Sequence, residues 1–434
     1  MCYYIKTFGC QMNVHDSEFI EGVLAKNGYK SSNGVDDADL IIINTCCVRA
    51  TAENKIYGFL DSLQRLKRGN PSLIIAVIGC LVSNEIAAKK VVQRGKIVDI
   101  VLGTRSLYRL PFYLGKLQEE KGPFVEIDLD ADVPEGRIHR RPDDFRAFVT
   151  IMYGCDNFCS YCVVPYVRGR EKSRSLKDIL QETEALAAEG TKEIMFLGQN
   201  VNSYGQGLEG AANFADLLRA ANAIPGIERI RYMTSHPKDF DDEIIAAIAE
   251  SPKVCRHFHL PAQSGSNHIL KAMNRHYNRE YYLDLLEKIK DRFPNATLTT
   301  DIIVGFPDET EEDFLDTIEL LKKVEFDLAY TFLYSPREGT PAAKKKQIPQ
   351  TIKKERLIRL MEIQNEISLR KNRALIGKEI VILGEGESHS NPAFQTGRTE
   401  GNKIVNFPSE RGMKGQMAKI NIMDAHTWSL EGRL

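Results

Sequence analysis

One loop of the sequence, Cys155-Asp156-Asn157-Phe158-Cys159-Ser160-Tyr161-Cys162, places three thiols within eight residues. Structural zinc sites usually take four ligands, as two Cys-x-x-Cys pairs or as a mixture of Cys and His. No fourth Cys or His lies close by in the sequence. Three thiolates on a cubane iron–sulfur cluster would instead leave one iron without a protein ligand and free to bind a substrate. The loop therefore predicts such a cluster, and the simpler alternative is a loop with incidental buried cysteines.

The composition is that of an ordinary globular chain, with 43% hydrophobic and 27% charged residues among 434. Such a length corresponds to about three domains. The net charge of −1 gives no global argument for nucleic-acid binding, so any such argument must be local. We see neither a secretory signal nor an apolar run long enough for a membrane span. Nine cysteines, an odd number, favour a reducing compartment and metal ligation, so we expect a cytoplasmic protein.

Residues 1–135 alternate short apolar segments with amphipathic ones. Strands rich in Ile and Val are expected at residues 3–8, 40–44, 73–78 and 99–102. Segments of helical length and periodicity lie between them, at residues 17–27, 50–67 and 84–94. The alternation predicts βαβ units and a parallel sheet covered on both faces. A polar stretch without periodicity, residues 123–144, is expected to link this domain to the next.

Each of the first three predicted strands ends in a cysteine, namely Cys10, Cys46 or Cys80. Ligands of an open parallel sheet bind at the carboxyl ends of its strands, so these thiols are expected to converge on one edge. Gly9 and Gly79 would let the backbone approach a bulky ligand closely. Three converging thiolates again suit a cluster with one open iron, although free Cys is also a common core residue. The other three thiols outside the loop share no such position: Cys2, Cys47 and Cys255.

Residues 141–372 contain six strand-plus-helix units. Their strands are expected at residues 148–152, 193–197, 229–233, 257–260, 297–304 and 328–333. Six units are too few for a closed eight-fold barrel, but reactive groups should still gather at the C-terminal ends of the strands. Polar or glycine residues lie at or near those ends: Gln199, Asn200, Ser235, Gln263, Asp301 and Gly305.

Basic charge is concentrated in two places. Arg168 and Arg170 follow the cysteine loop, and residues 344–373 carry ten Lys or Arg against three Glu. A helix is expected at residues 352–373, and its charge indicates either a phosphate-contacting surface or a solvated face. Residues 373–434 show short alternating segments between Gly-rich turns, which predicts a small antiparallel barrel. Candidate RNA contacts are Arg168, Arg170, Arg398 and Lys403.

Several of these motifs resemble known families. The cysteine loop, with an aromatic residue before its last Cys, resembles the signature of the radical S-adenosylmethionine (SAM) enzymes. Residues 373–434 resemble the TRAM domain, an RNA-binding module. Two segments resemble the N-terminal domain of the methylthiotransferases: Thr7-Phe8-Gly9-Cys10-Gln11-Met12-Asn13 and Asn44-Thr45-Cys46-Cys47-Val48-Arg49. The order of the three parts is also that of the methylthiotransferases.

The resemblance implies an architecture and a set of cofactors. An N-terminal parallel α/β sheet domain (1–135) would precede a partial (β/α)6 barrel (141–372) and a TRAM barrel (373–434). Two 4Fe-4S clusters would be bound, one by Cys155, Cys159 and Cys162 and an auxiliary one by Cys10, Cys46 and Cys80. Two SAM molecules per turnover and an external electron donor, such as a flavodoxin or ferredoxin, are implied. The polar residues at the strand ends are expected to contact SAM, with Tyr161 near its adenine.

The motifs are most similar to the branch of the family that acts on N6-dimethylallyladenosine next to the anticodon of tRNA. The resemblance implies that a 5′-deoxyadenosyl radical from SAM removes the hydrogen at carbon 2 of the adenine, where a methylthio group is then inserted. The partner would be the anticodon stem-loop, whose single-stranded bases can be splayed into a pocket. We expect the enzyme to be a monomer.

Other interpretations stay open. Sister branches of the family act on threonylcarbamoyl-adenosine in tRNA or on an aspartate of a ribosomal protein. A different class is a non-catalytic iron–sulfur protein that binds RNA or senses redox changes. The pair Cys46-Cys47 also departs from the family, where another small residue is expected at position 47. Cys46 is favoured as the ligand because its motif aligns there.

Overall fold

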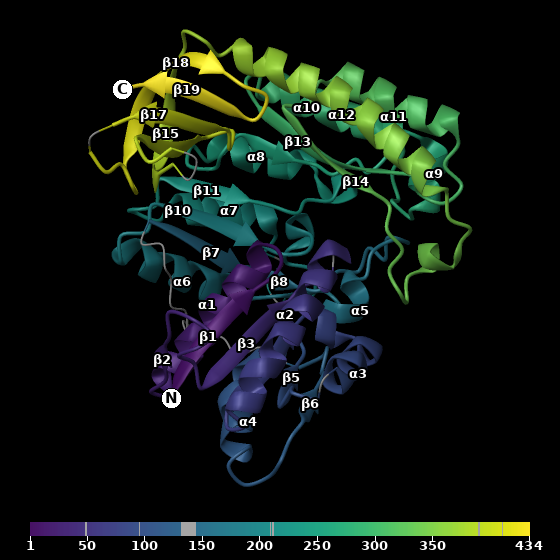
Figure 1. Cartoon of the computed structure of the whole chain (residues 1–434). Helices are drawn as coiled ribbons and strands as arrows, with labels where there is room; N and C mark the ends of the chain where they lie inside the picture. The colour runs from purple at the N-terminus through teal and green to yellow at the C-terminus, as the bar shows by residue number, and fades with distance from the viewer. Residues whose placement is uncertain are drawn as a thin grey trace.

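The computed structural model describes residues 1–47, 50–94, 96–131, 145–208, 210, 212–388, 391–409 and 411–434. Figure 1 shows the N-terminal domain at the bottom, a central region with both strands and helices, and a small C-terminal β-barrel (yellow) at the top. The expected domain boundaries at residues 135 and 141 lie outside the described residues, as do Val48 and Arg49 of the second motif. Within the described ranges, no helix has the length and apolar character needed to cross a membrane.

The N-terminal domain contains a parallel sheet, as predicted, but with six strands where the sequence indicated four. Its order is β2 (Lys30–Ser31), β1 (Cys2–Thr7), β3 (Leu40–Thr45), β4 (Ile74–Gly79), β5 (Ile100–Leu102) and β6 (Phe124–Glu126). Helices α1 (Gln11–Lys26) and α4 (Leu110–Lys116) cover one face, and α2 (Ala50–Gly69) and α3 (Glu85–Gln93) cover the other. Every residue of β3 is buried because successive side chains enter opposite cores. Each fully buried Leu or Ile contributes about 1.5–3 kcal/mol.

In this domain β2, β6 and α4 were not predicted, and α1 begins earlier than expected. The short strand β6 forms inside the expected linker and extends the sheet beside β5. Helix α1 starts at Gln11 instead of residue 17, because Cys10 is its N-cap and because Met12 and Asn13 of its first turn are buried. That turn packs against the central region, where the Thr150 hydroxyl lies 3.2 Å from Nδ1 of His15. Because this turn buries the polar Asn13 and exposes Val14, it lacks the one-sided apolar pattern by which a surface helix is recognised.

The central region is an open barrel of six parallel strands. One half pairs β7 (Arg146–Thr150), β10 (Glu193–Leu197) and β11 (Arg229–Tyr232), and the other pairs β12 (His257–His259), β13 (Thr297–Val304) and β14 (Leu328–Leu333). A bridge between Ile230 and Val254 joins the halves. Its outer helices share one core with the strands: α6 (Leu176–Ala188), α7 (Phe214–Asn222), α8 (Asp242–Glu250), α10 (Arg279–Arg292) and α11 (Glu311–Val324). This confirms the six predicted strands of the barrel.

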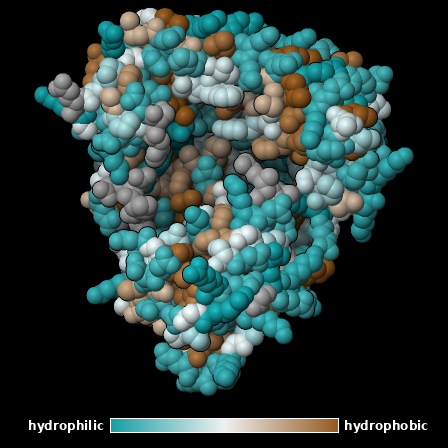
Figure 2. Space-filling view, in the orientation of Figure 1, coloured by the Kyte–Doolittle hydropathy of each residue, from teal (hydrophilic) through white to brown (hydrophobic). Residues whose placement is uncertain are grey.

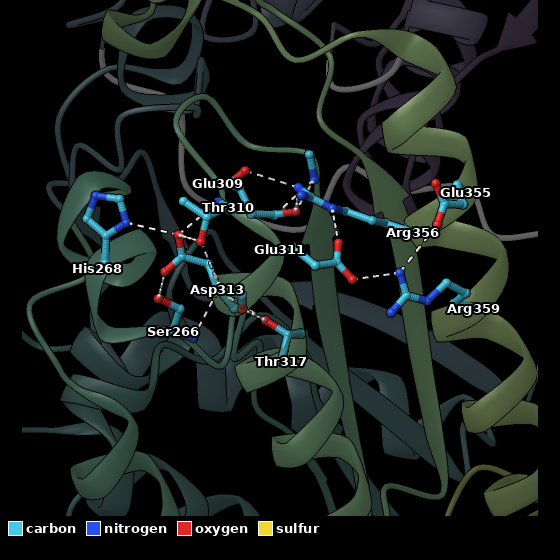
Figure 3. A network of polar contacts seen from close by, with 12 residues as sticks. Ser266, His268, Glu309, Thr310, Glu311, Asp313, Thr317, Glu355, Arg356 and Arg359 are labelled. Atoms are coloured by element: carbon cyan, nitrogen blue, oxygen red, sulfur yellow. Dashed lines mark hydrogen bonds and ion pairs between the residues drawn. The ribbon is translucent and has the colours of Figure 1, made fainter.

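The basic helix α12 (Gln350–Arg373) uses its charge to dock onto this barrel. Arg356 lies 2.7 Å from a Glu309 carboxylate oxygen, and the Arg359 guanidinium lies 2.7 Å from Glu311 (Figure 3). Both Glu309 carboxylate oxygens also accept the Gly305 backbone N–H. The predicted phosphate-contacting surface is therefore wrong for Arg356, because its side chain is buried against a carboxylate that the sequence pattern did not connect to it.

The C-terminal region is a closed five-stranded barrel. Its order is β15 (Glu379–Glu387), β16 (Phe394–Thr399), β17 (Ile404–Pro408), β19 (Ser429–Arg433) and β18 (Met417–Ala425). The predicted antiparallel pairing holds except between β17 and β19, which pair in parallel. The β16–β17 turn seals the N-terminal end of the central barrel, because buried Arg231 donates to the Thr399 and Glu400 carbonyls at 2.8 Å. Glu193 balances the Arg231 charge at 2.7 Å.

Candidate active site

The cysteine loop begins where β8 (Met152–Tyr153) ends and returns through β9 (Lys172–Ser173), which pairs with β8 antiparallel. Gly154 has φ +72°, and a Cβ there would collide with the Arg170 carbonyl oxygen. This close approach lets the Cys155 N–H donate to the Gly169 carbonyl at 3.3 Å. The two ends of the segment 154–170 are thereby fixed beside each other, and the three thiols are presented from one closed loop.

The three loop thiols lie close enough to influence one another. Burial, together with the charge of the nearby Cys159, raises the pKa of Cys155 to about 11 and that of Cys162 to about 12. Arg275 donates to the Cys159 sulfur at 3.4 Å. Buried thiols of this kind are poor free nucleophiles but become thiolates when a metal displaces their protons. Their environment suits ligation better than acid–base chemistry.

The second trio lies at the ends of three adjacent strands. β1, β3 and β4 pair side by side; Cys46 and Cys80 directly follow β3 and β4, and Cys10 lies three residues after the end of β1. The predicted convergence of these strand ends on one edge is confirmed. Gly79 has φ +97°, and a Cβ there would lie 2.7 Å from the Thr45 carbonyl oxygen. Glycine is required at this crowded edge because the backbone approaches its neighbour closely, as the sequence predicted.

Two buried asparagines hold these strand ends together. Asn13 donates to the Asn44 side-chain oxygen and to the Thr45 carbonyl, both at 3.0 Å. Asn44 donates in return to the Asn13 carbonyl at 2.8 Å and to the Ser17 hydroxyl at 2.9 Å. A fully satisfied buried network of this kind specifies a single arrangement. Both asparagines belong to the quoted motifs, but reasoning from sequence gave them no role.

Arg168 was predicted to contact RNA, but the structure does not place it on the surface. It ends helix α5 (Val164–Arg168), is only 6% exposed, and points into the N-terminal domain. Its Nε donates to the Cys80 sulfur at 3.2 Å, and its Nη2 lies 3.0 Å from the Asp16 carboxylate. Arg170, two residues later, is 67% exposed and pairs with Asp156. The sequence showed the cluster of cations but not which of them the fold buries.

Several buried polar atoms near the C-terminal ends of the barrel strands lack a hydrogen-bond partner. Among the described residues, the unpaired atoms include Gln199 Oε1, Ser235 Oγ and Gln263 Oε1, which sequence analysis had selected. A buried polar group without a partner costs about 1–3 kcal/mol, so such a group is usually satisfied by a ligand or by water. Three of them in this part of the barrel fit a polar ligand such as SAM.

Glu171 belongs to the same region and was missed by the sequence analysis. Its Oε1 is buried without a partner in the described chain. Burial raises the pKa of the Glu171 carboxyl to about 7, against a hydrogen bond with Ser203 that lowers it. A neighbouring ammonium group would relieve this cost of burial. The carboxyl gave no signal in the sequence because it sits in a run of mixed charge.

The remaining predicted SAM residues have other surroundings. Asn200 is already satisfied, since it donates to Asp239 at 2.7 Å and accepts the backbone N–H of His236 at 3.1 Å. Gly305 has φ +72°, and a Cβ there would collide with the Lys353 side chain, so its missing side chain makes room for α12. Asp301 lies within β13 at 3.7 Å from His259. Tyr161 packs against a small core that includes Phe306.

A pocket of about 510 Å³ lies where the C-terminal barrel meets β14 and α12. Arg398 and Lys403 both line it, together with the aromatic side chains of Tyr330 and Trp428. Their charges are partly matched, because Arg398 lies 3.0 Å from Glu385 and Lys403 lies 2.9 Å from Asp327. In Figure 2, hydrophilic residues cover most of the visible face, and a recess with hydrophobic residues opens near its middle.

No three side chains of His, Cys, Asp or Glu in the described ranges gather tightly enough to hold a single metal ion. In a 4Fe-4S cluster each cysteine binds a different iron, so cluster thiols need not converge on one point. The three thiols of the cysteine loop and the three at the sheet edge are therefore compatible with ligands that bind different irons of a cluster.

The comparison with known proteins covers the whole chain. The model of the radical SAM superfamily matches residues 149–321, that of the uncharacterized protein family UPF0004 matches residues 2–103, and that of the TRAM domain matches residues 373–434. A solved structure of the radical S-adenosylmethionine methyltransferase TsrM from Kitasatospora setae has a TM-score of 0.58 at 14% identity, over 79% of this chain and 77% of that one. This likeness concerns the fold.

Curated relatives are much more similar. The tRNA-2-methylthio-N(6)-dimethylallyladenosine synthase of Alkaliphilus oremlandii is 52% identical over 100% of this chain and 92% of its own length. The protein of the same name from Acetivibrio thermocellus is 51% identical over 100% of this chain and 90% of its own. The one from Desulforamulus reducens is 48% identical over 100% and 95%. The chain therefore belongs to the radical SAM family of tRNA-2-methylthio-N(6)-dimethylallyladenosine synthases.

Proposed function

We propose that this protein is a transferase that adds a methylthio group to carbon 2 of N6-dimethylallyladenosine next to the anticodon of tRNA. The observation that carries the proposal is the identity of about half of all residues, over the full chain, to relatives named for this activity. The ordered parts needed for it are present: a sheet edge with three thiols, an open barrel with a three-thiol loop, and a C-terminal barrel that matches the TRAM domain.

The family implies SAM and one 4Fe-4S cluster, and we assign that cluster to Cys155, Cys159 and Cys162. A second 4Fe-4S cluster is proposed on Cys10, Cys46 and Cys80. When bound, these groups supply the one-electron chemistry that breaks an unactivated C–H bond, which acid–base side chains cannot do at neutral pH. Each trio would leave one iron open, one for SAM and one for sulfur.

The protein's own groups would orient SAM at the strand ends of the barrel. Gln199, Ser235 and Gln263 offer buried polar atoms, and Glu171 offers a carboxylate for the ammonium group of SAM. Tyr161 is proposed to pack near the adenine, because it lies against the core that contains Phe306. Of the other three sequence candidates, Asn200 and Asp301 would act through their contacts with the His236 backbone N–H and with His259, and Gly305 would act only by making room for α12. Two SAM molecules per turnover and an electron donor such as a flavodoxin or ferredoxin complete the proposed reaction.

We assign RNA contacts to Arg170 and to the pocket with Arg398 and Lys403. Arg170 is exposed beside the cysteine loop, where the anticodon stem-loop must come if its base is to reach the barrel. The aromatic rings of Tyr330 and Trp428 in the pocket are suited to stack on unpaired bases. The enzyme is proposed to work as a cytoplasmic monomer.

Mass spectrometry of nucleosides tests the proposal. The anaerobically reconstituted protein is incubated with SAM, sulfide, dithionite and tRNA that bears either dimethylallyl- or threonylcarbamoyl-adenosine. A methylthio product on the dimethylallyl substrate alone is expected. A product on the other substrate alone would keep the reaction and change the substrate, and SAM cleavage without either product would direct attention to a ribosomal-protein aspartate. A protein that binds iron and RNA without cleaving SAM would be non-catalytic.

A further inference from the structure

Arg168 belongs to the central region, but its side chain extends to the second cysteine trio, Cys10, Cys46 and Cys80. It follows the cysteine loop in the chain, yet its guanidinium is buried in the N-terminal domain between Cys80 and Asp16. Cys10, from the first strand end, also lies within range of its charge. One side chain thus contacts or faces two of the three thiols at the sheet edge, and it comes from the other cysteine-bearing domain.

Residues of the N-terminal domain hold the backbone around Arg168 in place. Arg105 donates to the Arg168 carbonyl at 3.3 Å and to the Arg170 carbonyl at 2.9 Å, and the Thr104 hydroxyl donates to the Val167 carbonyl at 3.1 Å. Gly169 has φ +77°, which turns the chain sharply after the helix, and a Cβ there would lie 2.6 Å from the Leu129 carbonyl oxygen. The position of the guanidinium is therefore set by contacts on both sides of it.

From this arrangement we propose that Arg168 is a positioning residue that sets the reduction potential of the cluster on Cys10, Cys46 and Cys80. The inference rests on the proposed function, because it requires that the second cluster exists. The potential of an iron–sulfur cluster depends on its net charge, on hydrogen bonds to its sulfurs and on exposure to water. Arg168 supplies a hydrogen bond to one ligand sulfur and a buried positive charge beside it.

The sign of the effect follows from charge. A reduced cluster carries one more negative charge than an oxidised one, so a nearby cation stabilises the reduced form and raises the potential. Removing the Arg168 cation is expected to shift the potential downward. Removing the Asp16 carboxylate, which lies 3.0 Å from Arg168 and offsets its charge, is expected to shift it upward. Opposite shifts from the two partners of one ion pair are not expected of a purely structural contact.

The experiment isolates the second cluster. In full-length protein with Cys155, Cys159 and Cys162 all replaced by Ala, only the cluster on the sheet edge can form. Iron and sulfide content and a redox titration followed by electron paramagnetic resonance are measured for this background and with Arg168→Met, Arg168→Lys or Asp16→Asn added. We expect the same iron content throughout, a lower potential for Arg168→Met, a smaller shift for Arg168→Lys, and a higher potential for Asp16→Asn.

Arg94 and Asp61 form a matched control on the same domain. Their side chains pair at 2.6 Å but are about 40% exposed, and neither contacts a thiol among the described residues. Arg94→Met and Asp61→Asn are expected to leave the potential unchanged. Equal potentials for all Arg168 and Asp16 variants, with iron retained, would overturn the inference alone. A background protein that binds no iron would overturn the second cluster itself and the inference with it.

Loss of iron only in Arg168→Met would show that this variant disturbs assembly. Arg168→Lys and Asp16→Asn then decide, because both keep a polar side chain of similar shape in place. Opposite shifts of their potentials support the inference, and two unchanged potentials reject it.

Discussion

The two cysteine trios of this protein are built in different ways. Cys155, Cys159 and Cys162 come from one loop whose ends are fastened by a single backbone approach at Gly154. The other trio comes from the ends of β1, β3 and β4, which meet only when the sheet has formed. A local site depends on one turn of chain, whereas an assembled site depends on the stability of its whole domain.

Each trio also has one buried arginine next to a cysteine, and the two arginines differ in their partners. Arg275 donates to the Cys159 sulfur, to the Pro261 carbonyl and to tyrosine hydroxyls, and no carboxylate of the described chain pairs with it. Arg168 pairs with Asp16. The local site therefore contains an uncompensated cation and the assembled site a compensated one. This difference gives the two cysteine trios distinct electrostatic surroundings.

Removing each trio should give the largest contrast. Replacement of Cys155, Cys159 and Cys162 by Ala is expected to abolish both SAM cleavage and the methylthio product, because no iron remains to bind SAM. Replacement of Cys10, Cys46 and Cys80 by Ala should abolish the product only. Release of 5′-deoxyadenosine and modified nucleosides are measured together by mass spectrometry. Methylthio product from the second variant would refute the proposed role of the sheet edge in handling sulfur.

Cys46 and Cys47 offer a test within the assembled site. A Cβ on Gly9 would lie 2.9 Å from the Cys46 Cβ, which puts Cys46 beside the first strand end, whereas Cys47 belongs to the core under α2. We expect Cys46→Ala to lose about half of the bound iron and Cys47→Ala to keep it, since each 4Fe-4S cluster needs its own ligands. Cys47→Ala serves as the matched control, because Cys47 is the next residue in the chain and also hydrogen-bonds with Cys80. The reverse outcome would make Cys47 the ligand.

Gly79→Ala should weaken the assembled site and leave the loop site working. A residue with a side chain is strained at φ +97°, which costs roughly 1–3 kcal/mol. Its Cβ would also press on the Thr45 carbonyl. Iron content and urea unfolding of the full chain are the measurements, with SAM cleavage retained.

Gly58→Ala is the control for that variant. Gly58 lies exposed in α2 with nothing near its missing Cβ, so alanine should stabilise the helix by about 0.5–1 kcal/mol. Equal stability and equal iron content in both glycine variants would argue that the sheet edge tolerates more movement than its backbone contacts indicate.

Ser235→Ala should produce the smallest effect, and it tests the proposed SAM-binding end of the central barrel. Its buried hydroxyl lacks a partner in the described chain, so removing it is expected to leave stability unchanged or slightly higher. Loss of one hydrogen bond to SAM should weaken binding by about tenfold, or roughly 1.4 kcal/mol. Equilibrium binding of SAM to the reconstituted protein is measured. Ser251→Ala, which removes another buried hydroxyl without a partner in the described chain, should not change SAM binding.

Much of the fold could be predicted from the chain because its signals are local. Runs such as Leu40–Thr45, buried on both faces, and the short strands of the barrel are recognisable from β-branched residues and spacing. Elements without such a signal were missed. The strand β6 looked like linker, and Met12 in the first turn of α1 packs against Met195 and Leu197 of the barrel.

By itself the sequence determined the parts whose chemistry lies in residue type and close spacing: the three-thiol loop, the cysteines at three strand ends and the order of the domains. Only the tertiary structure decided which charges are buried and what they face. Arg168 meets Asp16 and Cys80 across 152 and 88 residues of chain, and Arg356 meets Glu309 across 47. Such pairs leave no periodic trace, because the contact is created by packing between elements and not by the local geometry of either one.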